Sequence, residues 1–347
     1  MKILINTPDT SLLGGVANHY KGLQPHWHED VTYNFIAGRK KIPGIVLLPF
    51  DLLVFFCKLM FGSYDAVVLN PSLGRTALKR DSLFLLIASL FNVKKLVFLH
   101  GWNDELSCEI DSDPRWFKSK YGKADGFFVL AKKFKDKLSS WGISKPIFLM
   151  TTKVETRLLT HKVVEKKSQQ KTILFLGRAE EYKGIFIAID AFIILKEIFP
   201  DLKLVVAGGG SALAHCKSKV ISEGISNVVF LGTIHGREIA EAFTNADLYI
   251  LPSYSEGMPT SLLEAMAFGL PIISTPVGGI PDFFDTKNMG ALVDSKKAKP
   301  FAKEMERLLN DPLEMVRISK FNKNYAKRHF MASAVAVDFE EKVKSFL

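Results

Sequence analysis

Short runs of β-branched and aromatic residues alternate with longer segments of helical periodicity, and the alternation starts afresh near the middle of the chain. This pattern is typical of parallel sheets with crossover helices. In the first half, the expected strands are Lys2–Asn6, Val31–Ile36, Ala66–Leu69, Leu96–Leu99, Gly126–Leu130 and Ile147–Met150. In the second half, they are Thr172–Leu176, Lys203–Ala207, Val228–Leu231, Leu248–Leu251 and Ile272–Ser274. Each set predicts one doubly wound α/β domain.

A polar and charged stretch, His161–Gln170, lies between the two sets and lacks apolar periodicity, as expected of an exposed connection. We therefore expect an N-terminal, acceptor-side Rossmann-like domain over residues 1–165 and a second Rossmann-like domain over residues 166–330. Residues 331–347 have a helical pattern and are expected to fold back on the first domain. Two such domains facing each other would form a cleft outside the carboxyl ends of their strands, where open α/β folds bind ligands.

The composition is that of a globular protein with an uneven charge distribution. With 347 residues, of which 48% are hydrophobic and 24% charged, the chain is long enough for two domains and is neither disordered nor fibrous. Its net charge of +10 lies within residues 1–170, which carry 25 Lys or Arg and 15 Asp or Glu. A basic half favours an anionic partner. Since no nucleic-acid module surrounds these residues, we expect a membrane surface or a phosphorylated substrate.

Several apolar segments bear on membrane contact. Ala131–Trp141 combines an apolar stripe with four lysines and could lie on anionic lipid, although an ordinary helix packed on its sheet fits the same pattern. Leu52–Met60 and Leu83–Leu90 are expected to be core rather than membrane segments. The longest uncharged stretch, Ala265–Pro281, is interrupted by prolines, so no membrane-spanning helix is expected.

The turn after the first strand of the second half carries two cations. Arg178 and Lys183 lie within Gly177–Gly184, at the mouth of a strand-to-helix turn. A guanidinium offers a bidentate fork and an ammonium a compact point charge, so the pair suits the oxygens of a diphosphate. From this pattern alone, solvated surface charges remain the alternative.

A pair of glutamates, Glu256 and Glu264, follows the strand Leu248–Leu251 with seven residues between them. Gly257 and Pro259 shape the turn before the next helix. The backbone N–H groups that would face an anion at this helix start belong to Met258, Thr260 and Ser261. A capping box is the alternative role for the second glutamate, because Ser-Leu-Leu-Glu also fits that motif.

Together these residues resemble the retaining nucleotide-sugar glycosyltransferases of the GT4 class, which have the GT-B fold. The two glutamates lie in the sequence motifs Ser-x-x-Glu-Gly-x-Pro and Glu-Ala-Met-Ala-x-Gly-x-Pro. Gly177-Arg178, Lys183-Gly184 and Val277–Pro281 match further family motifs. The resemblance covers the second half in detail and the first half thinly. This chain differs from the family at Met150–Glu155, where relatives commonly have Pro-Asn-Gly-Val-Asp.

The resemblance implies a role for each matching position. Glu264 would hold the ribose hydroxyls, Arg178 and Lys183 would clamp the diphosphate, and Glu256 would contact the donor sugar as part of the catalytic set. The loop Gly208–Gly210 would lie beside the nucleotide. The further positions expected to bind the donor are Gly14, Gly15, Gly208, Gly210, Thr233, Gly257, Met258, Pro259 and Thr260.

Two features of the first half fit the same resemblance. Gly14 and Gly15 open a helix after the first strand, where paired glycines let the backbone approach a phosphate. His100 ends the strand Leu96–Leu99, at a position where the family often has a histidine that contacts the donor sugar. A structural, hydrogen-bonded histidine is the alternative.

No metal site is predicted. Asp111-Ser112-Asp113 mimics the metal motif of the other major glycosyltransferase fold, but it precedes Pro114 and an expected helix, where acidic caps are common. His26-Trp27-His28 lacks further ligands at suitable spacing. The expected chemistry therefore uses no cofactor beyond a UDP- or GDP-linked sugar as co-substrate.

We therefore expect a retaining, metal-independent glycosyltransferase that moves a sugar to a hydroxyl on a lipid-linked or growing surface glycan, as in polysaccharide biosynthesis. Three cysteines without close spacing and an N-terminus without a secretion signal predict a cytoplasmic location, with peripheral contact at an anionic membrane. A sugar-nucleotide epimerase or phosphorylase on the same fold, or a non-catalytic nucleotide-sugar-binding module, are the alternatives.

Overall fold

The structure is a computed structural model that describes residues 1–12, 14–36, 44–161 and 170–347. The chain divides into two compact units. Unit 1 comprises Met1–Lys153 and Ala332–Leu347, and unit 2 comprises Val154–Met331. The division falls within Met150–Glu155, the segment whose sequence differs from the family pattern. The expected boundary near residue 165, and most of the expected connection around it, lie outside the described residues.

Unit 1 is built on a six-stranded parallel sheet in the order β2-β1-β3-β4-β5-β6. Its strands are β1 (Lys2–Pro8), β2 (Asp30–Ile36), β3 (Ala66–Leu69), β4 (Lys94–Leu99), β5 (Gly126–Val129) and β6 (Ile147–Leu149). The strand order reverses between β1 and β3, so the topological switch point lies at the carboxyl ends of these two strands.

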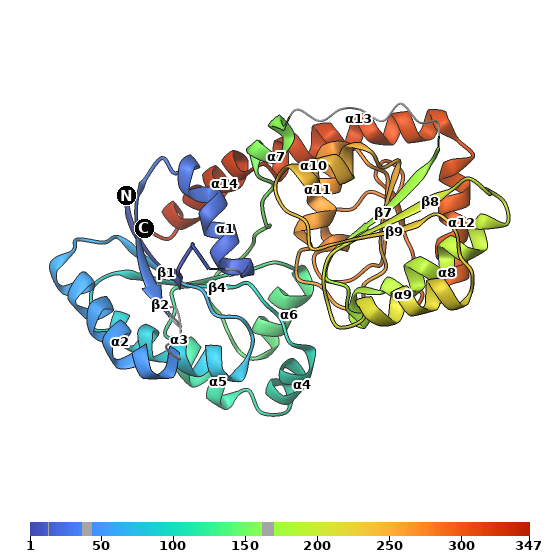
Figure 1. Cartoon of the computed structure of the whole chain (residues 1–347). Helices are drawn as coiled ribbons and strands as arrows, with labels where there is room; N and C mark the ends of the chain where they lie inside the picture. The colour runs from blue at the N-terminus through green and yellow to red at the C-terminus, as the bar shows by residue number, and fades with distance from the viewer. Residues whose placement is uncertain (13, 37–43, 162–169) are drawn as a thin grey trace. The chain divides into compact units, whose positions relative to one another are not determined.

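Helices cover both faces of this sheet, with α1 and α14 on one face and α2, α3 and α5 on the other (Figure 1). The helices of unit 1 are α1 (Gly15–Leu23), α2 (Gly44–Phe61), α3 (Arg75–Ala88), α4 (Asp104–Ser112), α5 (Arg115–Tyr121), α6 (Lys132–Ser140) and α14 (Ala332–Lys344), with a short 3-10 turn, η1 (Gln24–His26).

The last helix, α14, is held on unit 1 by a buried carboxylate. Glu340 accepts hydrogen bonds from the backbone N–H groups of His28 and Glu29, at 2.8 and 2.9 Å, and lies 3.1 Å from Nδ1 of His28. The neighbouring Phe339 is fully buried and meets the ring of Tyr20 edge-on. Because a buried carboxylate is stable only with such partners, α14 is fixed in register on unit 1.

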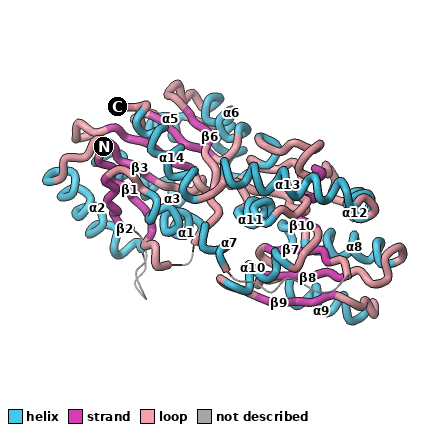
Figure 2. The backbone as a smooth tube through the Cα atoms, turned by 90° about the horizontal axis from the view of Figure 1, so that it is seen from above, coloured by secondary structure: helices cyan, strands magenta, loops and turns pink. Residues whose placement is uncertain are grey.

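Unit 2 contains a second six-stranded parallel sheet, in the order β12-β11-β10-β7-β8-β9, of which β10, β7, β8 and β9 are seen side by side in Figure 2. Its strands are β7 (Thr172–Leu176), β8 (Lys203–Ala207), β9 (Val228–Gly232), β10 (Leu248–Leu251), β11 (Ile272–Ser274) and β12 (Gly290–Leu292). The switch point lies between β7 and β10. β12 was not expected from the sequence, because three residues beginning with glycine carry little strand signal.

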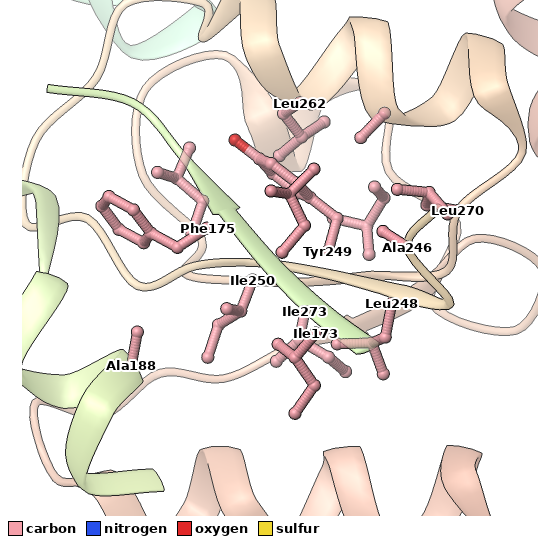
Figure 3. Close-up of a cluster of buried hydrophobic side chains, with 14 of the residues drawn as sticks. Ile173, Phe175, Ala188, Ala246, Leu248, Tyr249, Ile250, Leu262, Leu270 and Ile273 are labelled. Carbon is pink, nitrogen blue, oxygen red and sulfur yellow. The ribbon is translucent and has the colours of Figure 1, made fainter. Parts of the chain in front are cut away.

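The helices of unit 2 are α7 (Thr156–Thr160), α8 (Ile185–Lys196), α9 (Leu213–Ser222), α10 (Arg237–Thr244), α11 (Thr260–Phe268), α12 (Ala298–Leu309) and α13 (Pro312–His329), with 3-10 turns η2 (Glu181–Lys183) and η3 (Ile280–Asp282). Isoleucine, leucine and phenylalanine side chains of β7, β10 and β11 pack between these helices (Figure 3). Strands buried on both faces read as continuous apolar runs. The prediction of two doubly wound α/β domains is confirmed.

The expectation for one apolar segment of unit 1 is wrong. The segment Leu52–Met60 lies in α2, which was expected to be core, yet only Asp51, Phe55 and Leu59 of this helix are buried. By length and composition α2 could also cross a membrane, which was not anticipated. In α6, by contrast, Phe134 and Leu138 are buried, so its apolar stripe packs inside unit 1 rather than facing lipid.

Candidate functional site

The predicted site residues of unit 2 lie in loops at one edge of its sheet. Each loop follows the carboxyl end of a parallel strand, so the loops after β7, β8, β9, β10 and β11 meet at the same edge. The loops after β7 and β10 flank the switch point directly. These connections carry the two predicted cations and Glu256, and Glu264 lies in α11, the helix that follows the second loop.

The two loops at the switch point are joined by an ion pair. Nζ of Lys183 lies 2.7 Å from both carboxylate oxygens of Glu256, and Oγ of Ser253 donates a 2.7 Å hydrogen bond to the same carboxylate. Only 6% of the Glu256 side chain and 15% of the Lys183 side chain are exposed. The pair is therefore partly withdrawn from water, where a charge needs a partner. An ammonium has three donors, and one remains for another acceptor.

Arg178 lies on the exposed side of the same loop. Its guanidinium carbon is 5.4 Å from the centre of the Tyr182 ring, and Nζ of Lys183 is also 5.4 Å from that centre. Both predicted clamp cations therefore lie near the Tyr182 ring, and burial of this residue raises the pKa of its hydroxyl. Sequence reasoning missed this tyrosine, although a cation within about 6 Å of a ring centre is a recognised cation–π arrangement.

Close backbone contacts fix the shape of these loops and explain three of the glycines. A Cβ added at Gly208, which has φ +136°, would lie 1.8 Å from the carbonyl oxygen of Gly177. A Cβ at Gly210 would lie 2.3 Å from the carbonyl oxygen of Ala179, and one at Gly184 would lie 2.0 Å from that of Pro252. The Gly-rich loop after β8 is thus pressed against the Arg178 loop, which no larger residue would allow.

The loop after β11 supports the glutamate loop in the same way. The N–H of Gly279 donates a 2.7 Å hydrogen bond to the carbonyl of Gly257, and Oγ1 of Thr275 donates one of 2.6 Å to that of Ser253. Gly278 has φ +62°, and an added Cβ would lie 2.3 Å from the carbonyl oxygen of Glu256. The Val-Gly-Gly-Ile-Pro motif therefore holds the first glutamate in place.

Helix α11 begins at this site without a side-chain cap. Its N-cap is Pro259, so the alternative in which Glu264 closes a capping box on Ser261 is wrong. Oγ of Ser261 instead lies 2.7 Å from the hydroxyl of Tyr249, whose oxygen points toward α11 in Figure 3. Glu264 is half-buried in the second turn. Backbone N–H groups at an uncapped helix start attract anions.

The remaining predicted donor positions differ in exposure. Thr233 is exposed after β9, and its Oγ1 lies 2.7 Å from the point where a Cβ of Gly209 would be. Met258 is half-buried, Gly257 is half-buried and Thr260 is the first residue of α11. All of them belong to the same sheet edge of unit 2.

In unit 1, a network of neutral polar groups lies at the carboxyl ends of β1, β3 and β4. Asn70 donates through Nδ2 to the carbonyls of Asn6 and Val68, so its Oδ1 is an acceptor. That oxygen accepts a 2.6 Å hydrogen bond from the hydroxyl of Tyr20 and lies 3.0 Å from Nε2 of His100. His100 must therefore carry its proton on Nε2, which leaves Nδ1 as an acceptor.

Burial keeps both histidines of this network neutral. Burial of the ring, with His19 beside it, lowers the pKa of His100 well below its usual range. Burial lowers the pKa of His19 to about 3, and neither of its ring nitrogens has a hydrogen-bond partner among the described residues. The two rings are 5.0 Å apart. Asn70 and His19 were missed in the sequence, because neither stands in a recognisable motif.

Gly14 and Gly15 lie where they were expected, at the start of α1 after β1. Gly14 is the N-cap of α1 and makes no side-chain cap, and a Cβ at either glycine would meet nothing within 4 Å. Their small size is therefore not required by packing inside unit 1. Both are exposed, so their backbone N–H groups are open to solvent or to a ligand.

Asp111-Ser112-Asp113 was predicted not to bind a metal ion, and both aspartates have other partners in unit 1. Asp111 accepts a hydrogen bond from Nε1 of Trp141 at 2.8 Å and pairs with Lys137, while Asp113 pairs with Arg115. Within the part of the chain that the structure describes, no group of three or more His, Cys, Asp or Glu side chains is placed to hold a metal ion.

Comparison with known proteins identifies the domain. The family model of glycosyl transferases group 1 matches residues 157–326. The D-inositol 3-phosphate glycosyltransferase of Arthrobacter sp. (strain FB24) is 34% identical over 145 residues, which are 40% of this chain and 34% of that protein. The putative teichuronic acid biosynthesis glycosyltransferase TuaC of Bacillus subtilis is 30% identical over 199 residues, 55% of this chain and 48% of that protein. The chain spans half or less of the length of these curated relatives.

Two solved structures cover nearly the whole chain. The sucrose-phosphate synthase of Thermosynechococcus elongatus matches with a TM-score of 0.76 at 18% identity, covering 99% of this chain and 98% of that one. HepE of Anabaena in complex with UDP matches with a TM-score of 0.78 at 15% identity, covering 99% and 100%. At such identities the likeness shows the fold. The chain therefore carries a glycosyl transferases group 1 domain on a GT-B fold.

Proposed function

We propose that this protein is a retaining glycosyltransferase that moves a sugar from a nucleoside diphosphate to a hydroxyl acceptor. The observation that carries the proposal is the charged edge at the switch point of unit 2. There Arg178, the Lys183–Glu256 pair and the uncapped start of α11 gather within loops that close backbone contacts hold in place. The group 1 domain supports the same activity.

The donor is assigned to unit 2. Arg178 and the free donor of Lys183 bind the diphosphate, since cations and helix N-termini suit phosphate oxygens. Glu256 contacts hydroxyls of the donor sugar and Glu264 those of the ribose. The Gly208–Gly210 loop and Thr233 lie toward the nucleotide, which is UDP or GDP. HepE was solved with UDP, which supports this class of ligand.

His100, Gly14 and Gly15 are assigned to the donor sugar and phosphate on the side of unit 1. The neutral His100 offers Nδ1 as an acceptor for a sugar hydroxyl, and its Nε2–H is held by Asn70. A neutral acceptor suits a hydroxyl donor, because it adds no charge beside the oxocarbenium-like centre that forms in transfer.

The difficult step is departure of the charged diphosphate from the sugar. Cations and backbone amides can stabilise that charge as it develops, and one such donor contributes on the order of 10² to 10³ in rate. The proposal includes no resident cofactor and no metal, so addition of a chelator is expected to leave turnover unchanged.

The acceptor is assigned as a lipid-linked or growing surface glycan. Relatives named for teichuronic acid and amylovoran biosynthesis support a glycan acceptor, as does the fold shared with a lipopolysaccharide outer core galactosyltransferase. With a cationic unit 1, we place the protein in the cytoplasm with peripheral contact at the membrane.

The test replaces one cation and one carboxylate of the charged edge. Arg178→Ala and Glu264→Ala should each reduce transfer from a UDP- or GDP-sugar by about 100-fold or more, measured as nucleotide release with membrane extract as acceptor. The matched controls are Arg328→Ala and Glu306→Ala, which lie on helices α13 and α12.

Unchanged turnover in both site variants would overturn the donor assignment, provided that all four variants keep the circular dichroism and melting temperature of the parent. Nucleotide release that requires no acceptor would indicate an epimerase instead. Binding of nucleotide sugars without release, whatever acceptor is offered, would indicate a non-catalytic module.

A further inference from the structure

The adjacent helices α2 and α3 of unit 1 expose a set of large apolar side chains, which we name the α2–α3 face. Their exposed fractions range from 41% at Leu83 to 81% at Phe61. The face consists of Ile45, Val46, Phe50, Leu53, Met60 and Phe61 of α2, with Leu83 and Leu86 of α3 and Leu90 just beyond it. Single exposed apolar residues are common on proteins, but a patch shared by two adjacent helices marks an interaction surface.

The two helices are adjacent, and α2 lies along the sheet rather than projecting from it. Its buried residues, Asp51, Phe55 and Leu59, are spaced four apart and form one stripe. The ring of Phe55 meets that of Phe84 of α3 at 5.1 Å, and Lys58 donates a hydrogen bond to the carbonyl of Tyr33 in β2. Figures 1 and 2 show α2 at the side of the first sheet.

The exposed side of α2 carries no charge. The helix has a mean hydropathy of 2.1 over 18 residues, and only 17% of these residues are buried. Its two charged residues are the buried Asp51 and Lys58, whose ammonium bonds to backbone. A core helix of this hydropathy would be covered by other elements, whereas this one is apolar on the side that faces outward.

The cations beside the apolar centre are of two kinds. Arg75, Arg80 and Arg115 are paired with carboxylates. Lys79, Lys118 and Lys120 are exposed and have no ion-pair partner among the described residues. Helices α2, α3 and α5 together hold seven Lys or Arg residues and two Asp residues, Asp51 and Asp81, and both aspartates are buried. The neighbouring α5 also exposes 40% of Trp116 between its basic residues. An apolar strip flanked by lysines, arginines and an exposed tryptophan is the composition that suits a membrane interface.

We propose that the α2–α3 face binds the surface of an anionic phospholipid bilayer. α2 lies parallel to the bilayer and places its outward side at the boundary of headgroups and acyl chains, while Lys79 of α3 and Lys118 and Lys120 of α5 contact lipid phosphates. Two copies paired through this same face would bring their cations together, which opposes association. The inference rests on the peripheral membrane contact included in the proposed function and assigns it to one surface. Because it concerns unit 1 alone, it can fail without the proposed sugar transfer failing.

Vesicle flotation without nucleotide or sugar tests the face. The full chain should float with vesicles that contain phosphatidylcholine and phosphatidylglycerol, and more weakly with phosphatidylcholine alone. The triple variant Phe50→Gln/Leu53→Gln/Phe61→Gln should bind the mixed vesicles about 100-fold more weakly. A second variant, Lys79→Gln/Lys118→Gln/Lys120→Gln, should lose the preference for phosphatidylglycerol and much of the salt dependence.

The matched control changes equally exposed apolar residues of unit 2, as Ile221→Gln/Leu313→Gln/Val316→Gln, and should bind like the parent. Equal weakening by both triple variants, or no flotation of the parent chain, would overturn the proposal. So would a dimer in light scattering that the α2 variant converts to a monomer without any vesicle binding. Sugar transfer is measured separately, as nucleotide release with a water-soluble acceptor. A protein that is inactive in that assay can still bind vesicles, so the two outcomes remain distinguishable.

Discussion

The carboxyl edges of the two sheets share a doubly wound topology and differ in chemistry. In unit 2, the edge is charged, and its charged groups lie beyond the strands: Arg178, Lys183 and Glu256 in the connections after β7 and β10, and Glu264 in the second turn of α11. In unit 1, the hydrogen-bonding groups at the edge are neutral: the amides of Asn6 and Asn70 and the imidazole of His100 lie at or next to the ends of β1, β3 and β4. His19 of α1 packs beside His100, and the nearby cation is the buried Lys153.

The difference follows from where each edge meets water. Loops that stand beyond a sheet can carry charge, because solvent or an opposite charge compensates it, as Glu256 compensates Lys183. Groups at buried strand ends cannot, so amides and neutral imidazoles take their place. The charged edge suits an anionic ligand and the neutral edge suits hydroxyl groups.

The largest expected effect concerns the backbone contacts that shape the charged edge. Gly208→Ala should lower the free energy of unfolding by about 2–6 kcal/mol, because it combines a disfavoured φ of +136° with a Cβ 1.8 Å from a carbonyl oxygen. Urea unfolding measures this. The control is Gly224→Ala, which has φ +62° and an open surrounding and should cost about 1–2 kcal/mol. Equal losses of stability in the two variants would show that the close contact with the Gly177 carbonyl adds nothing to the cost of a positive φ.

The next effect concerns the ion pair. Lys183→Met leaves the carboxylate of Glu256 buried with Ser253 as its hydrogen-bond partner among the described residues and should destabilise the fold by about 3 kcal/mol. The double variant Lys183→Met/Glu256→Gln removes both charges and should recover most of that stability, while transfer stays low in both. Thermal melts and nucleotide release measure the two properties. A single variant as stable as the parent would mean that the pair is not coupled to folding.

The smallest expected effect concerns His19 in unit 1 and the pH dependence of stability. His19 has a pKa of about 3 when folded and a normal pKa near 6.5 when unfolded, so below pH 6.5 the unfolded chain binds more protons and stability falls as pH falls. Between pH 7.5 and 5.5 this residue should cost about 1.4 kcal/mol. His19→Leu should therefore lose less stability over that interval in urea unfolding.

Exposed His329 provides the matched control, because His329→Leu should keep the pH dependence of the parent. If His19→Leu also kept that dependence, the ring would be protonated in the folded protein and the edge of unit 1 would not be neutral.

Local pattern determined the two sheets and the positions of the site loops. Apolar runs and turn residues repeat at strand and helix periods, so all eleven strands expected within residues 2–274 could be placed without the tertiary structure. Of the strands in the described residues, β12 was the one not expected. The Gly-Arg, Lys-Gly and paired-glutamate motifs also lie next to strand ends in the sequence, which puts them at one edge of a parallel sheet.

Only the tertiary structure decided which side chains meet. The Lys183–Glu256 pair joins residues 73 apart, and Asn70 reaches His100 across 30 residues, neither of which spacing reveals. Hydropathy likewise made α2 look like core. Whether an apolar helix is buried depends on what packs over its outer side, a property of long-range arrangement that its own residues do not encode.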